Sequence, residues 1–180
     1  MRKSAAVTIA TALSAAAVVA APTHAHAGLP LLQCTGNIHT TYTPGLTDVP
    51  KPTDTTVDEA VGTSARPLGT CLVLGALITG GTHHHERVLT LSCLSLLQST
   101  PITETVTWNN GSSSTFSFPT SSYDDVNGET VITRVGTVTA GFGAGAPAQQ
   151  EVVLANTALL GCSTPAGVTT IDGATTLTIV

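Results

Sequence analysis

Charged and aromatic side chains are scarce in this chain of 180 residues. Only 9% of the residues are Asp, Glu, Lys or Arg, and only 3% are Phe, Trp or Tyr. Two of the six basic residues, Arg2 and Lys3, lie at the N-terminus, whereas all 11 acidic residues follow Gly28. Four basic against 11 acidic residues give the part after Ala27 a net charge of −7. Because nucleic acids and anionic membranes repel such a chain, we expect neither as a partner.

Helical periodicity is also missing after Gly28. Short runs rich in Thr and Val recur between Gly, Pro and Asn residues, and about one residue in five is Thr. The predicted strands are Gln33 to Tyr42, Thr55 to Val61, Thr70 to Ile78, Arg87 to Leu97, Thr103 to Trp108, Ser114 to Phe118, Glu129 to Thr139, Glu151 to Leu159 and Thr175 to Val180. This pattern predicts one all-β domain over residues 28–180. We expect an antiparallel β-sandwich with an immunoglobulin-like layout, and a small β-barrel is the alternative.

The first 27 residues have the three parts of a signal peptide. Arg2 and Lys3 form a positive region, Ala5 to Ala21 form an apolar region, and Ala25-His26-Ala27 has the small-x-small pattern of a cleavage site. We therefore predict a signal peptide over residues 1–27 with cleavage between Ala27 and Gly28. The apolar region is rich in Ala and short for a spanning helix, so we expect a secreted, extracellular protein without a stable membrane anchor.

Four cysteines follow the predicted cleavage site, and in an exported chain they indicate two disulfide bonds. A hairpin between Thr70 to Thr79 and Arg87 to Leu97, with its turn near Gly80-Gly81-Thr82, would place Cys71 opposite Cys93. Directly opposed residues come close enough for a disulfide. The favoured pairing is therefore Cys71 with Cys93, which leaves Cys34 with Cys162.

Two further turns are predicted from local sequence. In the run TVTWNNGSSSTFSF, Asn110-Gly111 suits a hairpin turn, and alternation directs Val106 and Trp108 into the core, as it does Phe116 and Phe118. The run from Asp124 to Gly128 indicates a second turn. The segment LVLGALI is too short to span a membrane, and we interpret it as a strand that is buried on both faces.

The run His83-His84-His85-Glu86 is the most conspicuous candidate site. Imidazole is a common ligand of zinc, copper and nickel, but in a strand only His83 and His85 share a face. The other histidine after Gly28 is His39, whereas a closed metal site needs three or four ligands. A solvated hairpin tip explains the run without a metal. We therefore assign no metal and no cofactor, and keep His83, His85 and Glu86 as weak candidates.

Catalytic motifs are missing from the sequence. No G-x-S-x-G elbow occurs, and the cysteines are assigned to disulfides, so we assign no catalytic residue and expect no enzymatic activity. The leading hypothesis is a non-enzymatic domain that binds a protein or a cell-envelope component. Two alternatives stay open: a secreted metal-dependent hydrolase that uses His83, His85 and Glu86, and a protease inhibitor that presents the loop Gly141 to Pro147.

One family resemblance accompanies these patterns. The segments CTGNIHTTYTPGLT, SCLSLL, TVTWNNGSSSTFSF, TVITRVGTVTAGFGAGAPAQQEVVLANTALLGC and TLTIV occur in this order and cover nearly the whole chain after Ala27. In this order they resemble a group of small secreted β-rich proteins of actinobacteria that have no assigned function. The resemblance implies an exported, disulfide-bonded β domain, and it transfers no active-site residue.

Overall fold

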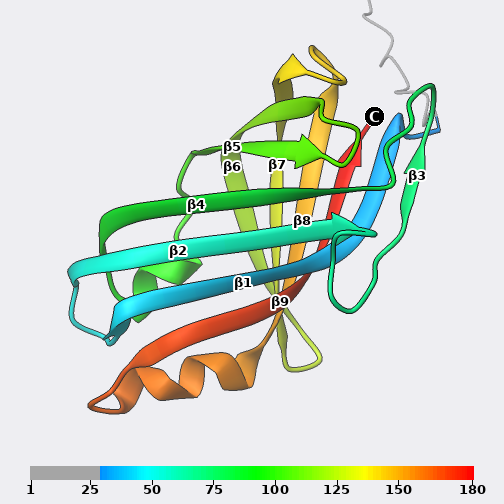
Figure 1. Ribbon diagram of the computed structural model, residues 1–180. Helices are drawn as coiled ribbons and strands as arrows, with labels where there is room; N and C mark the ends of the chain where they lie inside the picture. The colour runs from blue at the N-terminus through cyan, green and yellow to red at the C-terminus, as the bar shows by residue number, and fades with distance from the viewer. Residues whose placement is uncertain (1–28) are drawn as a thin grey trace, which may run out of the picture.

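The computed structural model describes residues 29–180, so the predicted signal peptide and the cleavage bond between Ala27 and Gly28 lie outside the described residues. Most of the described chain is β-structure (Figure 1). Its strands are β1 (Leu32–Leu46), β2 (Lys51–Gly62), β3 (Cys71–Val73), β4 (Gly80–Leu91), β5 (Ile102–Trp108), β6 (Ser113–Val126), β7 (Glu129–Gly141), β8 (Pro147–Ala155) and β9 (Val168–Ile179). Two short 3₁₀ helices, η1 (Cys93–Leu97) and η2 (Asn156–Ser163), complete it. None of the described helices has the length and apolar character needed to cross a membrane.

The strands close into an eight-stranded antiparallel barrel. Their order is β2-β4-β5-β6-β7-β8-β9-β1, and β1 pairs with β2 from Gly36↔Val61 to Thr43↔Asp54, which joins the two ends of the sheet. β3 pairs only with β1, outside this circuit. The all-β prediction is confirmed, but the sandwich with an immunoglobulin-like layout is wrong. A sandwich needs two sheets with free edges, whereas each of these eight strands has a neighbour on both sides.

Two predicted turns are confirmed. β5 pairs with β6 from Ile102↔Phe118 to Thr107↔Ser113, and Trp108 and Phe116 point into the core from opposite strands of this hairpin. At the turn between β6 and β7, Asn127 and Gly128 have φ angles of 54° and 84°. Both angles fall in the left-handed region that Asn and Gly tolerate best, which explains why these two residues occupy the turn.

The predicted hairpin around Gly80-Gly81-Thr82 does not form. β3 spans only three residues, and Leu72, Leu74 and Leu77 are exposed, so LVLGALI is not a buried strand. β4 instead begins at Gly80 and pairs with β2 along its whole length, from Gly62↔Gly80 to Lys51↔Leu91. The predicted strand Arg87 to Leu97 ends early, because its last part forms η1.

The two disulfides are consequently paired differently from the prediction. Cys34 is bonded to Cys71, its directly opposed partner between β1 and β3, with a Cα–Cα distance of 4.1 Å. Cys93 is bonded to Cys162, which links η1 to η2 at one end of the barrel (Figure 1). The rule that opposed residues form disulfides was right, but the partner of Cys71 lies on β1, which is distant in sequence.

The barrel interior has two apolar clusters, one toward each end. One cluster contains Trp108, Phe116 and Phe118, and the other contains Tyr42 and Ile171 close to the disulfide between Cys93 and Cys162. Inward-facing polar residues lie between the clusters along the strands: Gln150, for example, lies between Ala148 of the first cluster and Val152 of the second. The buried members of this polar layer are Glu59, Glu104, Gln150 and Thr175.

Candidate functional site

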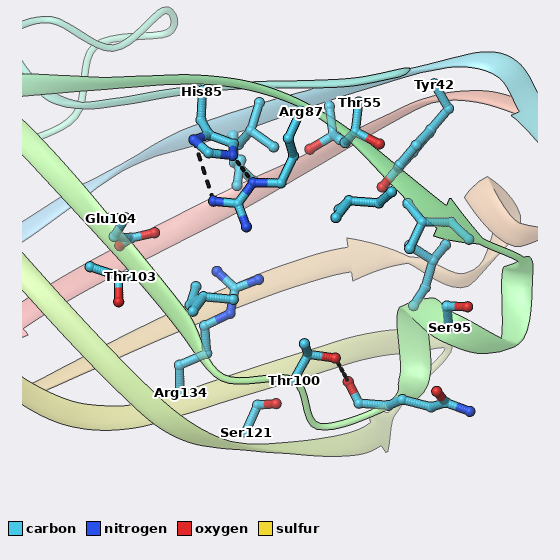
Figure 2. A pocket seen from close by; sticks show the side chains of 18 of the residues that line it. Tyr42, Thr55, His85, Arg87, Ser95, Thr100, Thr103, Glu104, Ser121 and Arg134 are labelled. Atoms are coloured by element: carbon cyan, nitrogen blue, oxygen red, sulfur yellow. Dashed lines mark hydrogen bonds between the residues drawn. The ribbon is translucent and has the colours of Figure 1, made fainter. Parts of the chain in front are cut away.

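The barrel wall opens between β4 and β5. These strands pair only at Gly81↔Trp108 and Thr82↔Thr107, and beyond this point β4 keeps a neighbour only on its β2 side. Gly81 allows the close packing at the junction, because a Cβ there would lie 2.5 Å from the Trp108 ring. Just beyond the junction, His83 Nδ1 lies 3.0 Å from the Thr105 carbonyl oxygen. The strands then separate around a cavity of about 220 Å³ (Figure 2).

One face of β4 forms a wall of this cavity. Because side chains alternate along a strand, His83, His85, Arg87 and Leu89 face the cavity while His84 and Glu86 face outward. The rings of His83 and His85 are stacked with centroids 5.9 Å apart. The Arg87 Nε–H donates to His85 Nε2 (Figure 2).

A buried polar network lies beside the cavity and is centred on Gln150. The Gln150 Nε2 amide donates to Glu59 Oε2 over 2.9 Å, to Glu59 Oε1 over 3.0 Å and to Glu104 Oε1 over 3.1 Å. Its Oε1 accepts a hydrogen bond from Arg134 Nη1. The Thr175 hydroxyl donates to Glu59 Oε1 over 2.7 Å. One uncharged side chain thus joins two carboxyl groups and a guanidinium group within a closed core.

Burial changes the protonation of these acids. Glu104 is only 6% exposed, and burial, reinforced by the nearby Glu59 carboxylate and opposed by Arg134, raises its pKa to about 8. Burial also raises the pKa of Glu59, although the Thr175 hydroxyl, Arg134, His83 and Gln150 act in the opposite direction. The pair therefore retains a proton at neutral pH, and we place it on Glu104 because Glu59 accepts more hydrogen bonds. In this state Glu104 is a neutral hydrogen-bond donor at the cavity wall.

Positive charge gathers at this cavity. Four of the chain's Lys and Arg residues follow Gly28, and two of them, Arg87 and Arg134, line this one cavity. Their guanidinium groups point toward one another across it (Figure 2). Within the part of the chain that the structure describes, no carboxylate lies within 4.0 Å of either group. In a chain with so few cations, this concentration distinguishes the cavity from the rest of the surface.

Apolar side chains and a buried hydroxyl occupy the other end of the cavity. The apolar lining includes Val57, Leu91 and Leu96, which also belong to the cluster near η1. Thr55 Oγ1 is buried here and has no hydrogen-bond partner among residues 29–180. A buried hydroxyl without a partner is unfavourable, and a bound molecule with a polar atom would satisfy it.

The structure separates the residues of the predicted metal candidate. His83 and His85 line the cavity, whereas Glu86 lies on the opposite face of β4 with His84, whose Nε2 is 3.6 Å from Glu86 Oε1. Among the described residues, no three His, Cys, Asp or Glu side chains gather to hold a metal ion. The histidines also lie within a strand and do not form a solvated hairpin tip, because β4 begins at Gly80.

The loop Gly141 to Pro147 is a compact turn between β7 and β8. The Ala144 N–H donates to the Gly141 carbonyl and the Ala146 N–H donates to the Gly143 carbonyl. Phe142 and Ala146 pack against the apolar cluster around Trp108. Most of this loop is therefore engaged with its own barrel.

Sequence reasoning missed three residues that line the cavity, Arg87, Glu104 and Arg134, and two that form the polar network beside it, Glu59 and Gln150. The signal that identifies one of them is strand alternation, since Glu104 precedes Val106 and Trp108 at spacings of two and four. A carboxyl group on the face that holds a core tryptophan must itself be buried. Comparisons with protein-family models, curated protein sequences and solved structures find no match for this chain.

Proposed function

We propose that this protein is a secreted, non-enzymatic binding protein that holds a small molecule in the cavity between β4 and β5. The observation that carries the proposal is the cavity itself, which adjoins the barrel core and is lined by both apolar and polar side chains. Small-molecule sites typically combine an apolar lining with a few converging polar groups, and they often lie at the open parts of barrels. Secretion is supported by two disulfides, which are typical of oxidising compartments.

The size of the cavity makes the proposed ligand more specific. It favours a small molecule over a protein or a cell-envelope component. Its volume of about 220 Å³ exceeds the ~150 Å³ of an engineered protein cavity that binds benzene. A molecule with one ring or a short chain fits this space. A polymer or a folded partner does not, although a side group of either could enter.

One observation favours an enzyme as a second candidate. A buried acid such as Glu104, with its pKa raised to about 8 and its side chain at a cavity wall, resembles a general acid. Glycoside hydrolysis by two carboxyl groups needs a second acid that reaches the substrate. Glu59 does not line this cavity, and Gln150 and Thr175 occupy its oxygens. The arrangement therefore favours binding over hydrolysis.

The test is a binding measurement with a matched pair of variants. Leu89→Trp places a bulky ring on the cavity face of β4, and Val88→Trp places the same ring on the outward face one residue away. Benzoate, benzylamine and benzyl alcohol are titrated into the isotope-labelled chain from Gly28 to Val180 and followed by amide NMR shifts. We expect at least one probe to shift the signals of cavity residues, with binding lost in L89W and kept in V88W. If no probe binds at millimolar concentration, or if L89W binds as well as V88W, the proposal is wrong.

A further inference from the structure

The cavity holds positive charge that the protein itself does not neutralise. The chain after Gly28 is strongly acidic, yet the two cavity arginines have no carboxylate partner in the described residues. Arg134 donates to the neutral amide of Gln150, and Arg87 donates to the imidazole of His85. Burial, followed by the charge of Arg87, lowers the pKa of His85, so this imidazole is neutral and supplies no countercharge to the solvent-exposed Arg87. The Glu59 carboxylate partly balances Arg134, but Arg87 retains its full charge.

Several polar groups around this charge are hydrogen-bond donors. The guanidinium groups of Arg87 and Arg134 face each other across the cavity (Figure 2). A guanidinium group presents a planar set of N–H donors that matches the two oxygens of a carboxylate. The protonated Glu104 adds an O–H donor at the same wall. An anionic group between the two arginines would therefore be contacted by donors on both sides.

An apolar part of the lining lies toward η1, where hydroxyl side chains such as Thr55 and Ser95 also line the cavity. Leu89, Leu91 and Leu96 form this part of the cavity, and none of them offers a polar side-chain atom. A fully hydrated ion such as phosphate would leave these side chains without a partner, whereas a hydrocarbon body would cover them. The arrangement thus suits a molecule with one charged end and one apolar end.

We infer that the cavity binds a small organic carboxylate, whose charged group lies between Arg87 and Arg134 and whose apolar body lies against Leu89, Leu91 and Leu96. This inference rests on the proposed function, because it names the class of ligand for the same cavity. It assigns to Arg87 the main charged contact and to Arg134 a second contact from the opposite wall.

The experiment compares three probes by isothermal titration calorimetry. Benzoate carries the charge and the ring, benzyl alcohol carries only the ring, and inorganic phosphate carries only the charge. We expect benzoate to bind at least about tenfold more tightly than benzyl alcohol, since a charge-assisted hydrogen bond corresponds to roughly a tenfold to hundredfold change in affinity. We expect phosphate to bind more weakly than benzoate.

Arginine variants locate the charged contact. Arg87→Gln should weaken benzoate binding about tenfold or more and leave benzyl alcohol binding nearly unchanged. Arg66→Gln is the matched control, because Arg66 donates to the backbone carbonyls of Thr63 and Ala65 outside this cavity. Arg134 also donates a hydrogen bond to the buried Gln150, so Arg134→Gln can lower stability as well as affinity. Its thermal unfolding is therefore measured together with its binding. Arg87→Gln is the variant that decides the result.

The outcomes separate the inference from the proposed function. If benzyl alcohol binds in the cavity as tightly as benzoate, or if R87Q leaves benzoate affinity unchanged, the cavity binds small molecules but the carboxylate inference is wrong. If phosphate binds as tightly as benzoate, the assignment of an apolar body is wrong. If the NMR titrations show no probe in the cavity, the proposed function fails and the inference fails with it.

Discussion

The two faces of β4 carry similar residues in different electrostatic settings. On the outward face, His84 Nδ1 lies 2.7 Å from Asp58 Oδ1, and on neighbouring strands His39 Nδ1 lies 2.6 Å from Asp172 Oδ1. On the inward face, His83 and His85 lie beside a backbone carbonyl and an arginine, with no carboxylate paired to either ring in the described chain. The outward pairs are complete within the protein. The inward groups leave donors and positive charge directed into a cavity, which is where a ligand can act on them.

The largest difference in stability between an inward and an outward substitution is expected at Gln150 and its neighbour Gln149. Gln150 is fully buried and joins Glu59, Glu104 and Arg134, whereas Gln149 is exposed on the other face of β8. Gln150→Ala should lower the free energy of unfolding by about 3 kcal/mol, because it leaves buried charged groups without partners. Gln149→Ala should have little effect. Urea unfolding followed by Trp108 fluorescence measures both, and equal stabilities would show that the network contributes nothing.

Glu104 is expected to have a smaller effect on stability, and this effect depends on pH. Its pKa in the folded state is about 8, well above the ordinary value of 4.5, so the folded protein binds a proton that the unfolded chain releases. The contribution of this proton to the free energy of unfolding is fully present below pH 4.5, the ordinary pKa of the group. It is lost as the pH rises toward about 8. The raised pKa of Glu59 acts in the same direction.

Glu104→Gln should remove most of this loss, since an amide has no proton to release. We expect the Tm of the parent protein to fall between mildly acidic and mildly alkaline pH, and the Tm of E104Q to fall less. Glu129→Gln at the exposed start of β7 is the control and should keep the pH profile of the parent. A parent Tm that rises over this interval, or an E104Q profile identical to that of the parent, would contradict the assignment.

Sequence reasoning predicted the parts of the fold that depend on neighbouring residues. The β5–β6 hairpin and the turn at Asn127-Gly128 follow from turn chemistry and alternation, both of which are local. The closure of the barrel depends on the pairing of β1 with both β2 and β9, and the β1–β9 pairing joins residues 122 to 147 positions apart, from Leu46↔Val168 to Leu32↔Ile179. No local pattern specifies that pairing. The same cause explains the wrong disulfides, because Cys71 meets Cys34 through β3 and β1.

The site was harder to predict from the sequence than the fold was. Alternation alone predicts that His83 and His85 share a face, and this is confirmed. Their role could not be predicted, because Arg87 and Arg134 come together only where β4 and β5 separate. The strands separate just beyond the junction of Gly81 with Trp108, which are paired in space and 27 positions apart in sequence. Charged residues at inward positions of a Thr- and Val-rich strand are the signal that would have identified the polar layer.

The smallest effect, and the most direct test of the comparison, concerns the pKa values of two histidines on opposite faces of β4. The hydrogen bond that His84 donates to the Asp58 carboxylate raises the pKa of His84 above its usual value, whereas burial, followed by the charge of Arg87, lowers that of His85. NMR titration of the ring protons should therefore show His84 protonated at a higher pH than His85. Asp58→Asn should lower the pKa of His84 and leave that of His85 unchanged, with little change in stability because the pair is exposed. Arg87→Gln should raise the pKa of His85 only in part, because burial is the larger cause. If the two rings titrate together in the parent protein, the electrostatic distinction between the faces of β4 does not exist.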